Sequence, residues 1–208
     1  MMKNNIIISG VPRAGKSTIS HILSKNFGYQ HVCMDSIIAG FERVFPELGI
    51  DTSAEMPSLE RLHNISAKIA PFIKAMMDSG EYDEFEPGMV LDVYQLLPEY
   101  YTEYLYHSNC NIFYFITSKT TPEERLSILK AYDTEKDYTF YKHDEELRKR
   151  CIELIEESKY IKAQCTKYNL PFYETAINRK EVFEEFLRQF SINHKLNYST
   201  VQENYIAM

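Results

Sequence analysis

Long apolar runs, glycine and proline are all scarce in this sequence. The chain has only 7 glycines and 8 prolines among 208 residues, which excludes a collagen-like or low-complexity protein. No run approaches the roughly 18 apolar residues that a transmembrane helix needs. The one early apolar run, Ile6 to Ile8, is too short for a secretory signal peptide. We therefore expect a cytoplasmic protein that does not interact with membranes.

Cysteine is also scarce, and its spacing is uninformative for metal binding. The four cysteines contain no C-x-x-C pair, and no histidine cluster lies at metal-ligand spacing. This pattern predicts free thiols or small buried side chains at Cys33, Cys110, Cys151 and Cys165.

Basic residues are too few for a nucleic-acid-binding surface. Lysine and arginine number 23 against 30 acidic residues, so the net charge is −7 and the sequence pI is about 5.4. This balance argues against nucleic acid or an anionic membrane as the main partner. Apolar residues make up 44% of the chain, enough to bury a core. We expect one domain over residues 1–190 and a C-terminal tail over 191–208, in a monomer or homodimer that binds a small molecule.

What the sequence does contain is an alternation of strand and helix patterns. Short apolar runs predict five strands, at Ile6–Ile8, Tyr29–Met34, 88–94, 111–117 and Leu170–Tyr173. Helical periodicity predicts helices at Lys16–Asn26, Ser36–Phe45, Ser58–Ser79, Pro98–His107, from Thr121, Asp144 to about Tyr168, and Lys180–Phe190. Such alternation is typical of an α/β protein in which a parallel sheet is covered by helices on both faces, in three layers.

The strongest motif is the segment Gly10-Val11-Pro12-Arg13-Ala14-Gly15-Lys16-Ser17, which fits G-x-x-x-x-G-K-[S/T]. It follows a predicted strand and opens a predicted helix, the context in which this motif binds phosphates. Lys16 is expected to reach the β- and γ-phosphates of ATP, and the Ser17 hydroxyl to bind Mg²⁺. The predicted nucleotide-binding residues are Gly10, Arg13, Ala14, Gly15, Lys16, Ser17 and Thr18.

Two aspartates follow predicted strands that flank the first one. Asp35 ends the second strand and Asp92 the third, so both carboxylates are expected at the edge of the sheet that holds the phosphate loop. One of them would take a proton from an acceptor hydroxyl, and the other would hold Mg²⁺ through water. An alternative for Asp35 is a helix N-cap, and for Asp92 a structural hydrogen bond.

Several segments together resemble the nucleoside/nucleotide kinase-like group of P-loop proteins, which includes adenylate kinase, shikimate kinase and chloramphenicol phosphotransferase. The segments are SGVPRAGKST, CMDS, VLDVY, TTPEERL and FYETAINRKEVFEEF, and the resemblance covers about residues 5 to 190. It implies a five-stranded sheet of order 2-3-1-4-5 and a P-loop kinase fold with a helical lid. The lid would lie at about 131–144, and a helical insertion on the acceptor side at about 36–86.

The resemblance implies an ATP- and Mg²⁺-dependent phosphotransferase. Adenylate kinase carries D-G-F-P-R after its third strand, whereas this chain reads Asp92-Val93-Tyr94-Gln95-Leu96 and lacks the arginine. This difference favours a hydroxyl-bearing small molecule as acceptor. A nucleoside or nucleotide acceptor, or an ATP-binding regulatory protein without transfer activity, remain as alternatives.

Phosphoryl transfer needs cations around the moving group. The resemblance places Arg125 near the ATP phosphates or adenine, and Arg148 follows the lid, so we assign catalytic roles to Lys16, Asp35, Arg125 and Arg148. Ser17 and Asp92 are the predicted metal ligands. The acceptor is expected to contact Asp35, Arg43, Asp92 and Tyr94. Lys149 and Arg150 are expected to be surface residues.

Overall fold

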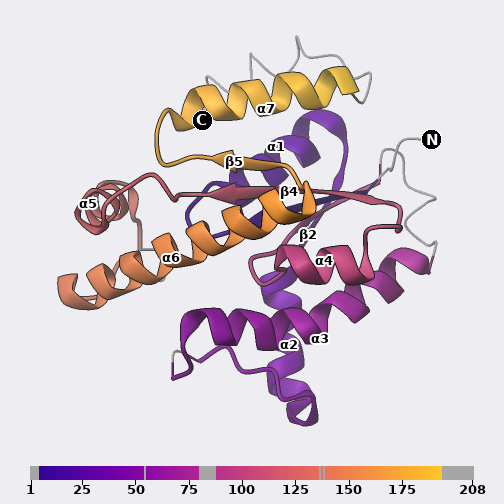
Figure 1. Cartoon of the computed structure of the whole chain (residues 1–208), viewed down its shortest axis with the longest axis horizontal. Helices are drawn as coiled ribbons and strands as arrows, with labels where there is room; N and C mark the ends of the chain where they lie inside the picture. Colours follow the sequence, from indigo (N-terminus) through magenta and orange to yellow (C-terminus); the bar gives the residue numbers. More distant parts are fainter. Residues whose placement is uncertain (1–4, 54, 80–87, 136, 138, 194–208) are drawn as a thin grey trace.

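Five parallel strands form a single sheet (Figure 1). A computed structural model describes residues 5–53, 55–79, 88–135, 137 and 139–193. The strands lie in the order β2-β3-β1-β4-β5, and each neighbouring pair is parallel. Their bounds are β1 Asn5–Gly10, β2 Gln30–Cys33, β3 Met89–Asp92, β4 Cys110–Ile116 and β5 Phe172–Glu174. The five predicted strands and their order are confirmed.

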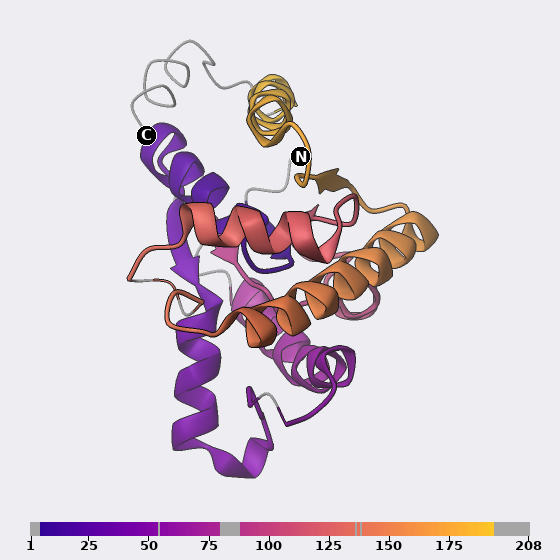
Figure 2. The ribbon, with the colours of Figure 1, turned by 90° about the vertical axis from the view of Figure 1, so that its left-hand side faces the viewer.

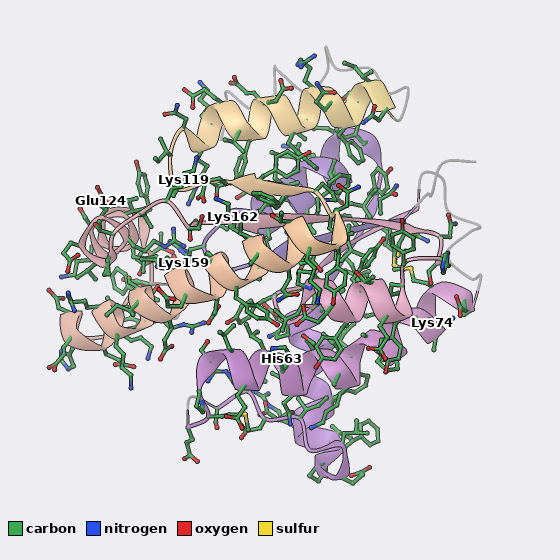
Figure 3. The ribbon with its side chains drawn as sticks, in the orientation of Figure 1. His63, Lys74, Lys119, Glu124, Lys159 and Lys162 are labelled. Atoms are coloured by element: carbon green, nitrogen blue, oxygen red, sulfur yellow. The ribbon has the colours of Figure 1, made fainter. Side chains whose placement is uncertain are left out.

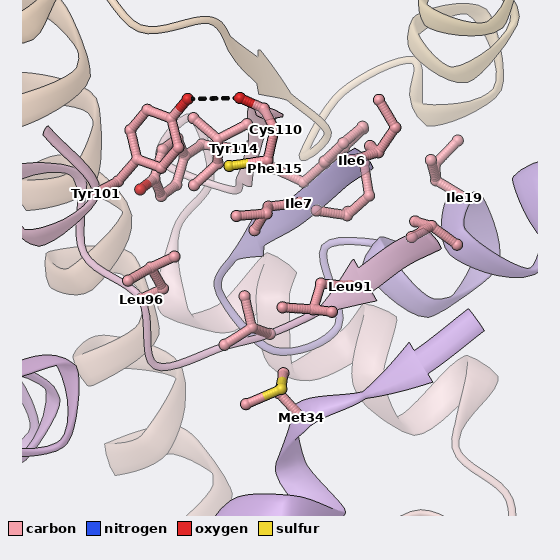
Figure 4. Packing of buried hydrophobic residues seen from close by; sticks show 14 of the residues in the cluster. Ile6, Ile7, Ile19, Met34, Leu91, Leu96, Tyr101, Cys110, Tyr114 and Phe115 are labelled. Carbon is pink, nitrogen blue, oxygen red and sulfur yellow. Dashed lines mark hydrogen bonds between the residues drawn. The ribbon is translucent and has the colours of Figure 1, made fainter. Parts of the chain in front are cut away.

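The central position of β1 follows from its composition. Ile6, Ile7 and Ile8 are fully buried, because helices cover both faces of the sheet at this strand. Ile7 aligns with Leu91 of β3 on one side and with Ile112 of β4 on the other. The surrounding core is shown in Figure 4. An uninterrupted β-branched run thus places the segment that follows it, the phosphate loop, at the middle of the sheet.

Helices form the two outer layers. Their bounds are α1 Lys16–Phe27, α2 Met34–Val44, α3 Ser58–Asp78, α4 Pro98–Tyr104, α5 Pro122–Tyr132, α6 Asp144–Tyr168 and α7 Arg179–Asn193. Helices α1 and α7 share one face, where the rings of Phe27 and Phe190 lie 5.9 Å apart, and α3, α4 and α6 pack together across the sheet (Figure 1). The predicted three-layer α/β/α architecture is confirmed.

Several helix boundaries differ from the predictions; α4, for example, ends at Tyr104 rather than His107. Helix α2 begins at Met34 with Cys33 as its N-cap, so the prediction of Asp35 as an N-cap is wrong: the chain passes from β2 into the helix without a loop. A 3₁₀ turn, Pro46–Leu48, follows α2. Helix α7 runs to Asn193, so residues 191–193 are helical rather than tail. The rest of the predicted tail, 194–208, and residues 80–86 of the predicted insertion lie outside the described residues.

The segment predicted as a helical lid, about 131–144, covers the connection between α5 and α6. These helices run in opposite directions, and residues 133–143 join them (Figure 2). Within the described part of the chain, this connection contains turns and no helix. Its role as a lid stays a prediction.

Two expectations about composition can be compared with the structure. All four cysteines are free; Cys33 is exposed and the other three are buried. Among the described residues, no helix combines the length and the apolar character that crossing a bilayer requires.

Candidate functional site

The phosphate loop adopts a conformation that only glycine permits at two positions. Gly10 and Gly15 have φ angles of 119° and 98°. A Cβ atom on Gly10 would lie 2.0 Å from the Phe115 carbonyl oxygen, and one on Gly15 would lie 2.1 Å from the Phe183 ring. Both the backbone angle and the close approach of neighbours therefore require glycine. The strand–loop–helix context predicted for the motif is present.

Lys16 begins α1 and points into the site. Its side chain is largely buried, and its Nζ donates a hydrogen bond to the Val11 carbonyl oxygen at 3.2 Å. Burial lowers the pKa of Lys16, while the charges of Asp92 and Asp35 raise it in part. An ammonium group that has lost much of its water favours an anionic ligand in its place. Ser17 and Thr18 follow on the first turn, exposed to solvent.

Three arginines connect the loop to its surroundings, one from within it and two from outside. The Arg13 backbone has a φ of 61°, and its guanidinium pairs with Asp133 at 2.8 Å and also with Asp137 in the α5–α6 connection. Arg125 is almost fully buried and donates from Nη2 to the Pro12 carbonyl oxygen at 2.9 Å. Arg179 donates in the same way to the Arg13 carbonyl oxygen at 2.8 Å. Arg125 therefore positions the loop backbone, and its direct catalytic role stays a prediction.

A cavity of about 620 Å³ opens beside the loop. Its lining includes the predicted site residues Arg13, Lys16, Ser17, Asp35 and Tyr94. Gln95 lines it too, and its Oε1 atom is buried without a hydrogen-bond partner among the described residues. The cavity therefore joins the phosphate loop, a carboxylate and an unsatisfied hydrogen-bond acceptor in one space.

Asp35 has the electrostatic setting of a proton acceptor. The residue is exposed at the surface, yet partial desolvation raises its pKa above the usual 3.8, and the charge of Asp92 raises it further. The charge of Lys16 opposes this shift, as do hydrogen bonds from the Gln95 side chain and the Tyr94 backbone. A raised pKa makes a carboxylate a stronger base, which suits proton removal from a hydroxyl.

Asp92 lies at the end of β3 and is not among the residues that line the cavity. Its side chain is 8% exposed, and His31 Nε2 lies 3.9 Å from its Oδ2 atom. No group of three histidine, cysteine or acidic side chains within the described ranges makes a closed metal site. The residues present, a Ser17 hydroxyl with carboxylates nearby, fit a Mg²⁺ ion that takes its remaining oxygen ligands from phosphates and water.

The prediction that Arg150 is a surface residue is wrong. Its side chain is 16% exposed and lines the cavity, and Nη1 pairs with Glu157 Oε1 at 3.0 Å. Glu157 is fully buried. The Tyr94 hydroxyl completes this network, since it donates to Glu157 Oε2 at 2.8 Å and accepts from Arg150 Nη2 at 2.9 Å. One signal was available: Glu157 stands between Leu154 and Ile161 on the apolar stripe of α6.

Arg61 is a second cavity residue that the sequence did not indicate. It lies on α3 and is 9% exposed, and its Nη1 donates to the carbonyl oxygens of Ser53 at 2.9 Å and Met56 at 3.1 Å. No carboxylate of the described residues forms an ion pair with it. Its guanidinium lines the cavity, and the charge of Asp51 is close enough to interact with it.

Comparison with known proteins identifies the fold. No protein-family model matches the chain, and no curated protein matches its sequence. A shikimate kinase from Bacteroides thetaiotaomicron has a similar structure, with a TM-score of 0.52 over 92% of this chain and 98% of that chain, at 15% sequence identity. The chain has the fold of the small P-loop kinases.

Two further P-loop kinase structures are more distantly similar. A dephospho-CoA kinase from Campylobacter jejuni gives a TM-score of 0.48 at 14% identity, over 93% of this chain and all of that one. A gluconokinase from Sinorhizobium meliloti 1021 gives 0.46 at 14% identity, over 88% and 89%.

Two predicted residues lie away from the cavity of this P-loop kinase fold. Arg148 is half-exposed on α6 and pairs with Glu123 of α5 at 2.6 Å. Arg43 is exposed at the end of α2. The outer faces of α5 and α6 are charged, as Glu124 and Lys159 illustrate in Figure 3. The catalytic role of Arg148 and the acceptor contact of Arg43 stay predictions.

Proposed function

We propose that this protein is an ATP- and Mg²⁺-dependent kinase that transfers the γ-phosphoryl group to a hydroxyl of a small anionic molecule. The observation that supports it most is the single cavity that Lys16 and Asp35 both line. A phosphate-binding lysine and a carboxylate base in one space are the two groups that transfer to a hydroxyl requires.

Each group then has a physical task. Lys16 would neutralise charge on the β- and γ-phosphates, and Ser17 would bind Mg²⁺. Bound Mg²⁺ would offset the charge that builds up between these phosphates during transfer. Asp35 would take the proton of the acceptor hydroxyl. Arg13, paired with Asp133, would keep the α5–α6 connection close to the loop and so limit the access of water.

Two features of the cavity favour an anionic, hydroxyl-bearing acceptor. Gln95 Oε1 is buried, finds no partner among the residues that the structure describes, and would accept a hydrogen bond from a ligand hydroxyl. Arg61 faces the cavity as a buried cation, and a carboxylate or phosphate on the acceptor would pair with it.

A nucleotide acceptor is less well supported. In adenylate kinase an arginine binds the acceptor phosphate, and Leu96 occupies the equivalent position in this sequence. Leu96 is buried in the core, with 1% of its surface exposed, so this position supplies no side chain that could bind an acceptor phosphate.

The test is ATP consumption by the purified protein against pools of small molecules sorted by charge. We expect an anionic, hydroxyl-bearing pool to accelerate consumption by the wild type and not by Lys16→Ala. Acceleration by neutral polyols alone would contradict the assignment of Arg61. ATP binding without acceleration by any pool would favour the regulatory alternative.

A further inference from the structure

We propose that Tyr94 is a positioning residue that fixes the charged groups of the cavity from three sides. Its hydroxyl bonds to Glu157 and Arg150, its ring lies against Lys16, and its backbone lies next to Asp35. The inference rests on the proposed function, because positioning matters only if these groups act together. It concerns a residue whose expected role was acceptor contact alone.

The hydroxyl of Tyr94 is fully engaged. It donates to Glu157 Oε2 at 2.8 Å and accepts from Arg150 Nη2 at 2.9 Å, and Arg150 also pairs with Glu157. These three groups form a closed ring of charge-assisted hydrogen bonds. Because Glu157 is fully buried, this hydrogen-bond network holds Arg150 in one orientation at the cavity wall.

The ring of Tyr94 lies under the phosphate-loop lysine. Lys16 Nζ is 5.7 Å from the ring centroid, a distance at which a cation interacts favourably with an aromatic face. The ammonium is buried, so this interaction is weakly screened. The ring therefore helps to hold Lys16 toward the cavity before nucleotide binds.

The backbone of Tyr94 lies next to the carboxylate of Asp35. It is among the groups that lower the pKa of Asp35, whose side chain lines the cavity from α2. Tyr94 lies two residues after β3, the strand between β1 and β2, so its position is set by the sheet itself. One residue on a rigid edge thus connects the phosphate loop, the carboxylate on α2 and the arginine on α6.

Two substitutions separate the contributions. Tyr94→Phe keeps the ring and removes the hydroxyl, whereas Tyr94→Leu removes both. Tyr101→Phe is the matched control, since the Tyr101 hydroxyl is also buried and bonded, to the Cys110 carbonyl oxygen at 3.1 Å, and lies outside the cavity (Figure 4).

Proton NMR of the Lys16 and Arg150 side chains provides readouts that need no acceptor. In the wild type and in Tyr94→Phe, the Lys16 Cε protons should be shifted upfield by the ring, and in Tyr94→Leu this shift should disappear. Tyr94→Phe should speed solvent exchange of the Arg150 guanidinium protons about tenfold, because a charged hydrogen bond is lost. Tyr94→Leu should also weaken ATP affinity about threefold to tenfold.

The outcomes distinguish this inference from the proposed function. Once an acceptor is identified, Tyr94→Phe should raise the acceptor KM more than it lowers kcat, and Tyr101→Phe should change neither. Absence of the upfield shift in the wild type would overturn the role of the ring. Equal Arg150 exchange in Tyr94→Phe and the wild type would overturn the role of the hydroxyl. If the NMR results appear without phosphoryl transfer, the positioning stands and the kinase proposal fails.

Discussion

At the scale of single residues, Asp35 is where function and stability are opposed. Its pKa is raised in the folded protein, so the ionised form is less favourable there than in the unfolded chain. Stability from this group is therefore fully present below the ordinary carboxyl pKa and is lost as pH rises through the raised pKa. A carboxyl group whose pKa is raised in this way is typical of an active site.

Asp35→Asn should lower kcat by about 10²-fold or more, because a general base is removed, with little change in ATP affinity. The same change should raise the melting temperature at pH 7 and leave it unchanged well below pH 3.8. Steady-state kinetics and thermal unfolding at both pH values measure the two effects.

Asp51→Asn is the matched control for stability, since hydrogen bonds from Ser53 lower the pKa of Asp51. Its substitution should not raise the melting temperature. An Asp35→Asn protein with wild-type turnover would remove Asp35 from the mechanism.

A second prediction at the residue scale concerns glycine. Gly10→Ala should destabilise the fold by more than about 2 kcal/mol, because φ is 119° and the new Cβ would meet the Phe115 carbonyl oxygen at 2.0 Å. Gly40→Ala in α2 should stabilise it by about 0.5–1 kcal/mol, because that Cβ would meet nothing within 4 Å. Denaturant unfolding measures the free energy of unfolding of both variants. Equal changes in the two would contradict the loop conformation described for Gly10.

At the scale of elements, the Arg13 ion pairs tie the α5–α6 connection to the phosphate loop. Arg13→Ala should speed amide exchange at Phe140 and Lys142, whose backbone amides bond within this connection, about tenfold. Arg148→Ala removes an exposed ion pair between the same two helices and should change the exchange little. Identical exchange in both variants would show that Arg13 does not hold the connection.

The elements also show what the sequence predicted well and what it did not. The strands were predictable because Ile6 to Ile8 and the other apolar runs indicate burial directly. The position of Asp35 beside the phosphate loop was predictable because the carboxyl ends of parallel strands meet at one edge of the sheet. Arg150 was not, since α6 is rich in charge and its partner Tyr94 is 56 residues away in the sequence. Arg61 was not either, because only tertiary packing distinguishes a buried arginine from the solvated ones around it.

At the scale of the whole molecule, nucleotide binding should stabilise the fold. At about 100 times Kd, a ligand of the native state adds about 2.7 kcal/mol, which is about 5–10 °C for a chain of this size. We expect ATP with Mg²⁺ to raise the melting temperature by this amount in the wild type and not in Lys16→Ala. Lys74→Ala is the control, since Lys74 pairs with Asp78 on the exposed side of α3 (Figure 3). A shift that Lys16→Ala retains would place the nucleotide elsewhere.

The measurement that tests the kinase proposal most directly follows the γ-phosphoryl group of labelled ATP in the presence of the acceptor pools. The account predicts that the label appears covalently on an anionic acceptor with the wild type, falls about 10²-fold with Asp35→Asn, and is absent with Lys16→Ala. Label found only as inorganic phosphate, whatever the pool, would contradict it.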